Sequence, residues 1–220
     1  MFTGHSPRFA LLALFLRTFF KLLYQPLAWT YDWVADIVSV GMWKDWVMTV
    51  QPFISGSHIL EIGHGPGHLL AALNQPTRTI IGIDRSSQMS HIAYRRLSRE
   101  NISPKLIISD AQCLPLENNC LDNIVATFPS EYILDPHTLA ESYRVLKPGA
   151  KLIIVPYAWI TGTKPLHKAA AWLFNVTGES PKPGTSSLQP LHEAGFMATA
   201  EKIILEASTV LIIQAKKPSI

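Results

Sequence analysis

The chain has 220 residues, 48% of them hydrophobic and 16% charged, which suits one globular domain with a sizeable core. Its formal net charge is only +3, so electrostatics give no case for a nucleic-acid partner. The two cysteines, Cys113 and Cys120, have a spacing that suits neither a zinc site nor a redox pair, and we expect reduced thiols in a cytoplasmic protein.

Residues 8–29 form an unusually apolar segment near the N-terminus. Arg17, Lys21 and Gln25 recur every fourth residue, which predicts one narrow polar stripe on a helix that Pro26 ends or kinks. The run is too short and too charged for a typical membrane span. It favours an interfacial helix that contacts anionic lipid at the inner membrane surface. A helix that packs on its own domain as a lid over the pocket, and a span or signal peptide, are the alternatives.

The rest of the chain predicts an α/β domain. Residues 30–54 repeat apolar side chains at helical spacing, which indicates one or two further helices. From residue 58 strands and helices alternate, so we expect a doubly wound, mostly parallel sheet covered on both faces by helices. The predicted strands are 58–63, 79–84, 105–110, 123–128, 151–157, 197–207 and 208–217. The predicted helices are 68–74, 86–101, 137–149 and an inserted one at 168–176. We predict an N-terminal helical extension over 1–50 and the domain itself over 51–220.

The segment ILEIGHGPGHLL places Gly63, Gly65 and Gly67 at the first strand-to-helix turn, where open parallel sheets bind their ligands. A dinucleotide turn reads G-x-G-x-x-G, and here the third glycine comes one residue early. No Gly-Lys-Ser/Thr follows, which excludes a phosphate-binding P-loop. The turn therefore predicts a nucleotide-like ligand of another kind.

Acidic residues at the ends of three strands narrow the choice of ligand. Glu61 precedes the turn and would repel a pyrophosphate, whereas the ammonium and sulfonium groups of S-adenosylmethionine suit it. Asp84 ends the second strand, where a carboxylate accepts hydrogen bonds from ribose hydroxyls. Asp110 and the backbone of Ala111 follow the third strand and suit the edge of adenine. Taken alone, Glu61 and Asp110 are also compatible with acids that only stabilise their own turns.

These motifs, with LDNIVATF and VLKPGAKLIIV, resemble those of the class I S-adenosylmethionine-dependent methyltransferases over roughly residues 52–217. The resemblance implies a seven-stranded sheet in the order 3-2-1-4-5-7-6 with the last strand antiparallel, and S-adenosyl-L-methionine as cofactor. It also implies cofactor contacts, with Met89 packed on adenine and Thr127 and Phe128 at the methyl-bearing end. The full implied set is Tyr31, Glu61, Gly63, Gly65, Gly67, Asp84, Arg85, Met89, Asp110, Ala111, Thr127 and Phe128.

A narrower resemblance lies in YDWVADIVSVGMWKDW, residues 31–46, which is similar to a segment of the ubiquinone and menaquinone biosynthesis C-methyltransferases. Related bacterial phospholipid N-methyltransferases share that layout, and in both Tyr31 would help to close the cofactor site. This chain departs from the quinone enzymes at Ala35, where their segment has Asn. It departs again at TFPSEYI, residues 127–133, where they carry a Gly-x-Arg-Asn stretch on the substrate side.

Methyl transfer from a sulfonium depends mainly on alignment, and a general base is needed only when the acceptor must lose a proton. The candidates for such a base are Glu131, Tyr132, His137 and Tyr157. His64 and His68 flank the glycines without a convincing set of metal ligands, so we expect no metal.

The sequence therefore predicts an S-adenosylmethionine-dependent methyltransferase that acts on a small, apolar or lipid-like acceptor. Methylation of a phosphatidylethanolamine-type amine is the alternative within the class. An NAD-binding oxidoreductase and a non-catalytic cofactor-binding domain are the alternatives outside it.

Overall fold

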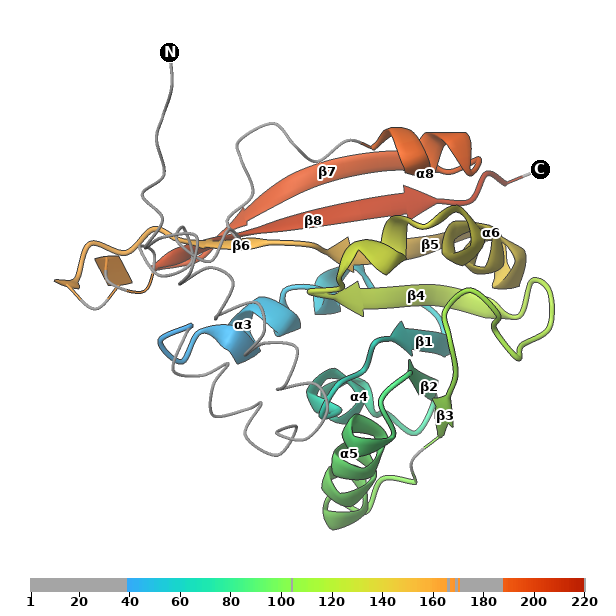
Figure 1. Cartoon of the computed structure of the whole chain (residues 1–220), viewed down its shortest axis with the longest axis horizontal. Coiled ribbons are helices and arrows are strands. Elements are labelled where there is room, and N and C mark those ends of the chain that lie inside the picture. The colour runs from blue at the N-terminus through green and yellow to red at the C-terminus, as the bar shows by residue number, and fades with distance from the viewer. Residues whose placement is uncertain (1–38, 104, 166, 169, 171–187, 220) are drawn as a thin grey trace, which may run out of the picture.

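We describe residues 39–103, 105–165, 167–168, 170 and 188–219 of a computed structural model. Over these ranges a single mixed sheet runs through the molecule (Figure 1). The predicted helices at 8–29 and 168–176, and Tyr31, lie wholly or mostly outside the described residues. Within the described part of the chain, no helix is long and apolar enough to cross a membrane.

The sheet has the predicted topology. Its hydrogen-bonded order is β3-β2-β1-β4-β5-β8-β6, and β7 pairs with β8 from Thr209 to Lys216, on the edge opposite to β5 and β6. The strands are β1 His58–Ile62, β2 Thr79–Asp84, β3 Leu106–Ile108, β4 Leu121–Thr127, β5 Leu146–Val155, β6 Ala158–Ile160, β7 Met197–Ile204 and β8 Ser208–Lys216. The pairs among β1 to β5 are parallel, and β8 is antiparallel to all its neighbours.

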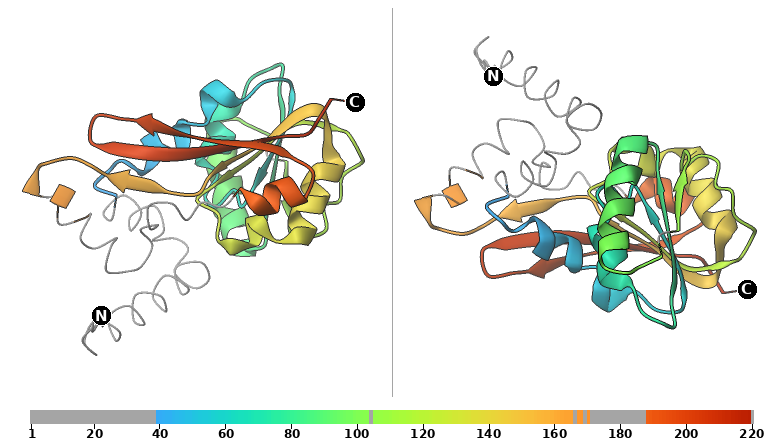
Figure 2. Two further views of the ribbon diagram at one scale, coloured as in Figure 1. Left: turned by 90° about the horizontal axis from the view of Figure 1, so that it is seen from above. Right: turned by 90° about the horizontal axis from the view of Figure 1, so that it is seen from below.

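The short strand β6 continues the line of β5 along the same side of β8. The interruption lies at Pro156 and Tyr157, and the N–H of Leu211 bridges it by donating to the Tyr157 carbonyl oxygen at 3.0 Å. Counted as one interrupted strand, β5 and β6 give a seven-stranded sheet in the order 3-2-1-4-5-7-6, which confirms the predicted fold. The far ends of β6, β7 and β8 project beyond the helices (Figure 2).

Helices cover both faces of the sheet, as the continuous apolar strands require. The helices are α3 Trp43–Met48, α4 His68–Leu73, α5 Ser87–Arg99, α6 Pro136–Val145 and α8 Gln189–Glu193, with 3-10 turns η2 Gln51–Phe53 and η3 Glu131–Leu134. On one face, α3 and α4 bury Trp46, Val47 and Leu69 against the sheet. On the other face, α6 and α8 bury Leu139 and Leu191.

The boundary between α6 and β5 differs most from the prediction. Helix α6 ends at Val145, and β5 already begins at Leu146, so the Lys-Pro-Gly that follows lies within the strand. The register between β4 and β5 shifts in this region, and Gly149 takes a φ of 81°, which is typical of an irregularity in a strand. Helix α8 was not predicted, because its five residues show too little periodicity to be seen.

Asp122 ties the beginning of β4 to the beginning of β1. Its Oδ2 accepts the N–H groups of Ser57 and His58, both at 2.9 Å, and its Oδ1 accepts from Lys147 Nζ at 2.7 Å. Burial opposes ionisation, but the hydrogen bonds from Lys147 and the two backbone N–H groups outweigh it and lower the pKa of Asp122 well below its usual range. The native state therefore holds this carboxylate in its charged form.

We expect Asp122→Asn to lower the free energy of unfolding at neutral pH by about 1–3 kcal/mol, because charge-assisted hydrogen bonds are lost. A pKa lowered in the folded state stabilises the protein above the unfolded pKa of about 3.9, and this stabilisation is lost as the pH falls. Urea unfolding of both proteins from neutral pH down to about pH 3 measures the difference. The gap should narrow on acidification, and a gap that widens would contradict the assignment.

Candidate active site

The glycine turn between β1 and α4 has the backbone that its sequence predicts. Gly63, Gly65 and Gly67 take φ values of 71°, 51° and 81°, which residues with a side chain rarely adopt. Each glycine meets a different requirement. A Cβ on Gly67 would lie 2.9 Å from the Cβ of Ala93 in α5, whereas a Cβ on Gly65 would meet nothing within 4 Å. Gly67 therefore permits close helix packing, and Gly65 leaves open space above the turn.

Glu61 lies at the end of β1, directly before this turn, and only 2% of its surface is exposed. Among the described residues, its Oε2 has no hydrogen-bond partner. Burial, and then the negative charge of Asp84, raise the pKa of Glu61 well above the usual value, against the opposing effect of a hydrogen bond from the backbone of Leu70. Within the described part of the chain, the site thus contains a buried carboxyl group that no cationic side chain accompanies.

Asp84 ends β2, and its carboxylate accepts hydrogen bonds from both the glycine turn and the turn that leads into α5. Its Oδ2 accepts the N–H of Gly65 at 3.0 Å, and its Oδ1 accepts the N–H of Ser86 at 2.8 Å. Each carboxylate oxygen can accept a further hydrogen bond, so the group can still bind hydroxyls. The structure therefore brings Asp84 and the glycine turn together, as the spacing in the sequence predicts.

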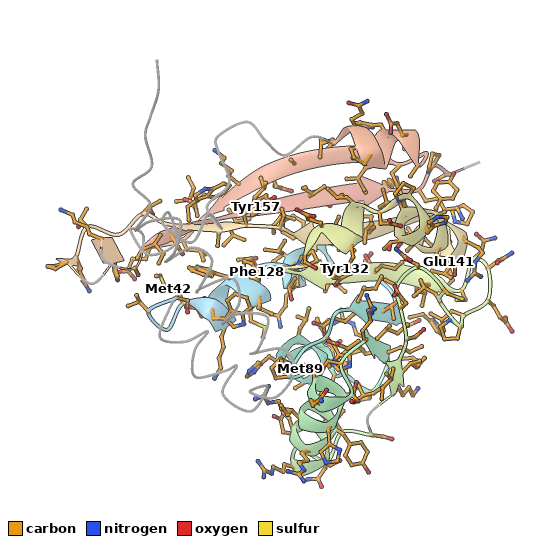
Figure 3. The ribbon with its side chains drawn as sticks, viewed as in Figure 1. Met42, Met89, Phe128, Tyr132, Glu141 and Tyr157 are labelled. Atoms are coloured by element: carbon orange, nitrogen blue, oxygen red, sulfur yellow. The ribbon has the colours of Figure 1, made fainter. Side chains whose placement is uncertain are left out.

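The residues predicted to surround adenine lie beyond β2 and β3. Asp110 is half exposed, and its Oδ2 lies 3.4 Å from Arg85 Nε. Its Oδ1 accepts the N–H of Gln112 at 3.1 Å, which is a turn-forming contact. Ala111 and Met89 are both buried, with Met89 on α5 only 1% exposed. Met89, labelled in Figure 3, is thus held in the core.

An aromatic cluster lies at the carboxyl end of β4. Phe128 follows Thr127 and takes a φ of 49°, which is uncommon for a bulky residue. Its ring centroid lies 4.4 Å from that of Trp43 and 6.1 Å from that of Trp46, both on α3. The N–H of Phe128 also donates to the carbonyl oxygen of Val155 at 2.7 Å. Packing and this hydrogen bond together hold the strained conformation at the end of the strand.

One of the four candidates for a general base lies against the glycine turn. A Cβ built on Gly63 would be 2.5 Å from the hydroxyl of Tyr132, so η3 places this phenol directly over the turn (Figure 3). Glu131 and His137 are exposed, and Tyr157 lies beyond β5 with its backbone paired to Leu211. No contact of these three with the turn is recorded among the described residues.

Around the turn the structure adds Ser90 and Arg96, which sequence reasoning missed, and gives partners to His64. His64 is 3% exposed, with Nδ1 2.8 Å from the Gly65 carbonyl oxygen and Nε2 3.4 Å from Ser90 Oγ. Arg96 Nη1 donates to the carbonyl oxygen of Pro66 at 2.8 Å. Burial lowers the pKa of His64, against the effects of Asp84 and the turn backbone. These contacts join α5 to positions 26 and 30 residues earlier in the chain, so the sequence carries no local signal for them.

The sequence is similar to those of known methyltransferases over the segment that contains this site. Residues 59–149 match the sequence model of a methyltransferase domain. A demethylmenaquinone methyltransferase from Symbiobacterium thermophilum is 31% identical over 140 residues, which cover 60% of this chain and 56% of that protein. A ubiquinone/menaquinone biosynthesis C-methyltransferase from Legionella pneumophila is 28% identical over 193 residues, covering 82% of this chain and 74% of that protein.

Solved structures share the fold. A putative S-adenosyl-L-methionine-dependent methyltransferase from Methanococcus maripaludis has a TM-score of 0.61 at 21% identity, covering 88% of this chain and 92% of its own. A phosphoethanolamine N-methyltransferase from Haemonchus contortus has a TM-score of 0.59 at 18% identity, covering 81% of this chain and 53% of its own. At these sequence identities, the structural similarity shows a shared fold and nothing more specific. Residues 59–149 thus match a methyltransferase domain, and the fold and the glycine turn agree with the class I S-adenosylmethionine-dependent methyltransferases.

S-adenosyl-L-methionine is the methyl donor typical of this family, and the residues present fit it. The open space above Gly65 suits a close approach of the ligand to the backbone. The buried oxygen of Glu61 that lacks a partner suits a cationic group. The carboxylate of Asp84, beside the turn, suits hydroxyl donors. Three independent features of the structure thus agree with one ligand.

Proposed function

We propose that this protein transfers a methyl group from S-adenosyl-L-methionine to a small, apolar or lipid-like acceptor. The observation that carries the choice of acceptor is the aromatic cluster at the carboxyl end of β4. Phe128 packs against Trp43 with ring centroids 4.4 Å apart, and it presents an apolar surface where the family places the methyl-bearing end of the cofactor. The relatives named for demethylmenaquinone and ubiquinone synthesis support an apolar ring as acceptor.

In this proposal the strand ends hold the cofactor. Glu61 would face its ammonium group, Asp84 its ribose hydroxyls, and Asp110 with Ala111 its adenine. When bound, S-adenosylmethionine supplies an electrophilic methyl group on a positively charged sulfur. Phe128 and Trp43 would exclude water from the acceptor side, so alignment rather than acid–base chemistry supplies most of the rate.

Tyr132 is the residue that we propose to touch the reacting end. Its hydroxyl lies over Gly63, between the turn and the segment that follows β4. There the phenol can orient an acceptor by donating or accepting a hydrogen bond, and it can pass a proton if the acceptor must lose one. Glu131 and His137 remain weaker candidates because both are exposed.

The proposal extends to the arrangement of the chain. Residues 1–50 would form a helical extension that closes the pocket and contacts the membrane surface, and 51–220 the cofactor-binding domain. Helix α3 at the end of the extension already packs into the core, since Trp46 is 1% exposed and Val50 fully buried. Because α3 also contacts Phe128, this packing supports an extension that lies against the acceptor side of the site.

Methyl transfer from labelled S-adenosylmethionine tests the proposal. The purified chain is incubated with a demethylmenaquinone-type ring, with phosphatidylethanolamine, and with a soluble amine, the first two in detergent micelles. We expect label in the ring and a rate at least about tenfold lower with either amine, a difference of about 1.4 kcal/mol in barrier. Label in phosphatidylethanolamine alone would establish the lipid N-methyltransferase instead. Absence of label from all three, with S-adenosylhomocysteine bound, would favour a non-catalytic cofactor-binding domain.

A further inference from the structure

Glu61 is a buried acid in an apolar setting. Its neighbours in register are Gly82 on β2 and Val125 on β4, neither of which carries a polar side chain. Helix α4 covers it and offers the backbone N–H of Leu70. Its Oε2 has no hydrogen-bond partner among the described residues. An ionised carboxylate in such a place costs several kcal/mol unless a cation accompanies it.

Among the residues that the structure describes, the charged and titratable groups around Glu61 do not provide that cation. Asp84, at the end of β2, is negative and opposes ionisation of Glu61. Burial lowers the pKa of His64, in the turn, which favours its uncharged form. His68 begins α4 and is only half buried, so solvent screens it. From α5, Arg96 reaches the same turn but donates to the carbonyl oxygen of Pro66 at 2.8 Å.

We propose that Glu61 is a neutral carboxylic acid in the ligand-free protein and ionises when a ligand with an ammonium group binds at the glycine turn, so that cofactor binding releases one proton. The O–H bond of the acid breaks, the proton passes to solvent, and the carboxylate remains opposite the ammonium. This inference rests on the proposed function, because it requires the methionine end of the cofactor to lie beside Glu61.

The sign of the pH dependence follows from this exchange. The ligand-free protein has a raised pKa at Glu61, and a bound ammonium would lower that pKa again. Between the two values, binding releases a proton, so affinity for S-adenosylhomocysteine rises with pH by up to about tenfold per pH unit. Above the higher value the affinity becomes constant. A nucleoside ligand without an ammonium gains nothing from ionisation, so its affinity should not rise with pH.

Calorimetry in two buffers of different ionisation enthalpy counts the protons released. The wild-type chain is titrated from about pH 6 to about pH 7.5 with S-adenosylhomocysteine, and separately with 5′-methylthioadenosine, which lacks the amino-acid group. We expect proton release with the first ligand and none with the second. Equal proton counts for the two ligands would overturn the inference.

Two variants complete the test. Glu61→Gln should bind S-adenosylhomocysteine with an affinity that no longer rises with pH, and without proton release. The matched control Glu117→Gln, an exposed acid away from the turn, should behave as wild type. If Glu61→Gln does not fold, the comparison of the two ligands on the wild-type chain still decides. Binding of S-adenosylhomocysteine without proton release overturns this inference alone, whereas a folded chain that does not bind it overturns the proposed function as well.

Discussion

Asp84→Ala is expected to weaken the binding of S-adenosylhomocysteine by at least about 100-fold, or about 3 kcal/mol. Each hydrogen bond between a ribose hydroxyl and a carboxylate contributes about 1.5–3 kcal/mol, and the proposed site has two of them. The same substitution removes the acceptors of the Gly65 and Ser86 N–H groups, at 3.0 and 2.8 Å. The turn therefore loses its support together with the ligand contact. Calorimetric titration of both proteins measures the loss.

Two controls separate the ligand contact from the support of the turn. Asp84→Asn keeps one oxygen and the shape of the side chain but removes the charge, and we expect an affinity between those of wild type and Asp84→Ala. Thermal unfolding of each variant shows whether the domain remains folded. A folded Asp84→Ala protein with wild-type affinity would refute the role given to this acid. Loss of binding in the exposed control Glu117→Gln would show that the assay responds to something else.

Trp46→Ala is expected to lower the free energy of unfolding by about 3–5 kcal/mol, the range for deleting a large buried aromatic side chain. Trp46 is 1% exposed, and its Nε1 donates to Ser208 Oγ at the start of β8 at 2.8 Å. The centroid of its ring also lies 6.1 Å from that of Phe128, so the substitution would leave a cavity within the aromatic cluster that we propose to line the acceptor side. Urea unfolding measures the change in stability.

A smaller substitution tests the hydrogen bond by itself. Ser208→Ala removes the acceptor of the Trp46 indole N–H and should cost about 1–3 kcal/mol, because a buried donor loses its partner. In a double-mutant cycle, the two losses should add to more than the loss in the double variant. The exposed neighbour Lys44→Ala should change stability by less than about 0.5 kcal/mol. Strictly additive losses would mean that Trp46 and Ser208 do not act together.

Much of the domain could be predicted because its signals are local. The strands around residues 58–63 and 79–84 were recognised from short apolar runs, and the structure has β1 and β2 there. The glycine turn was recognised because positive φ angles demand glycine, and all three glycines have them. The family resemblance supplied the strand order, which local patterns alone do not determine. The inserted helix at 168–176 and Tyr31 lie outside the described residues for the most part, and remain predictions.

Contacts between distant segments could not be predicted in the same way. Tyr132 was one of four equal candidates, and only the path of η3 places its hydroxyl over Gly63. The indole of Trp46 meets Ser208 across 162 positions of sequence. Such pairs leave no periodic signal, because each depends on how whole elements pack rather than on the spacing within one element.

The amino-acid sequence by itself determined the class of fold, the glycine turn and the acids at the strand ends. These depend on backbone conformations and apolar periodicities that a few neighbouring residues dictate. The tertiary structure decided which groups are buried and which meet. Glu61 is a buried acid, and Phe128 is part of the aromatic cluster, only because α3, α4 and the sheet pack around them. Burial, and with it the charge state of a carboxyl group, is a property of the assembled core and not of the segment that carries the residue.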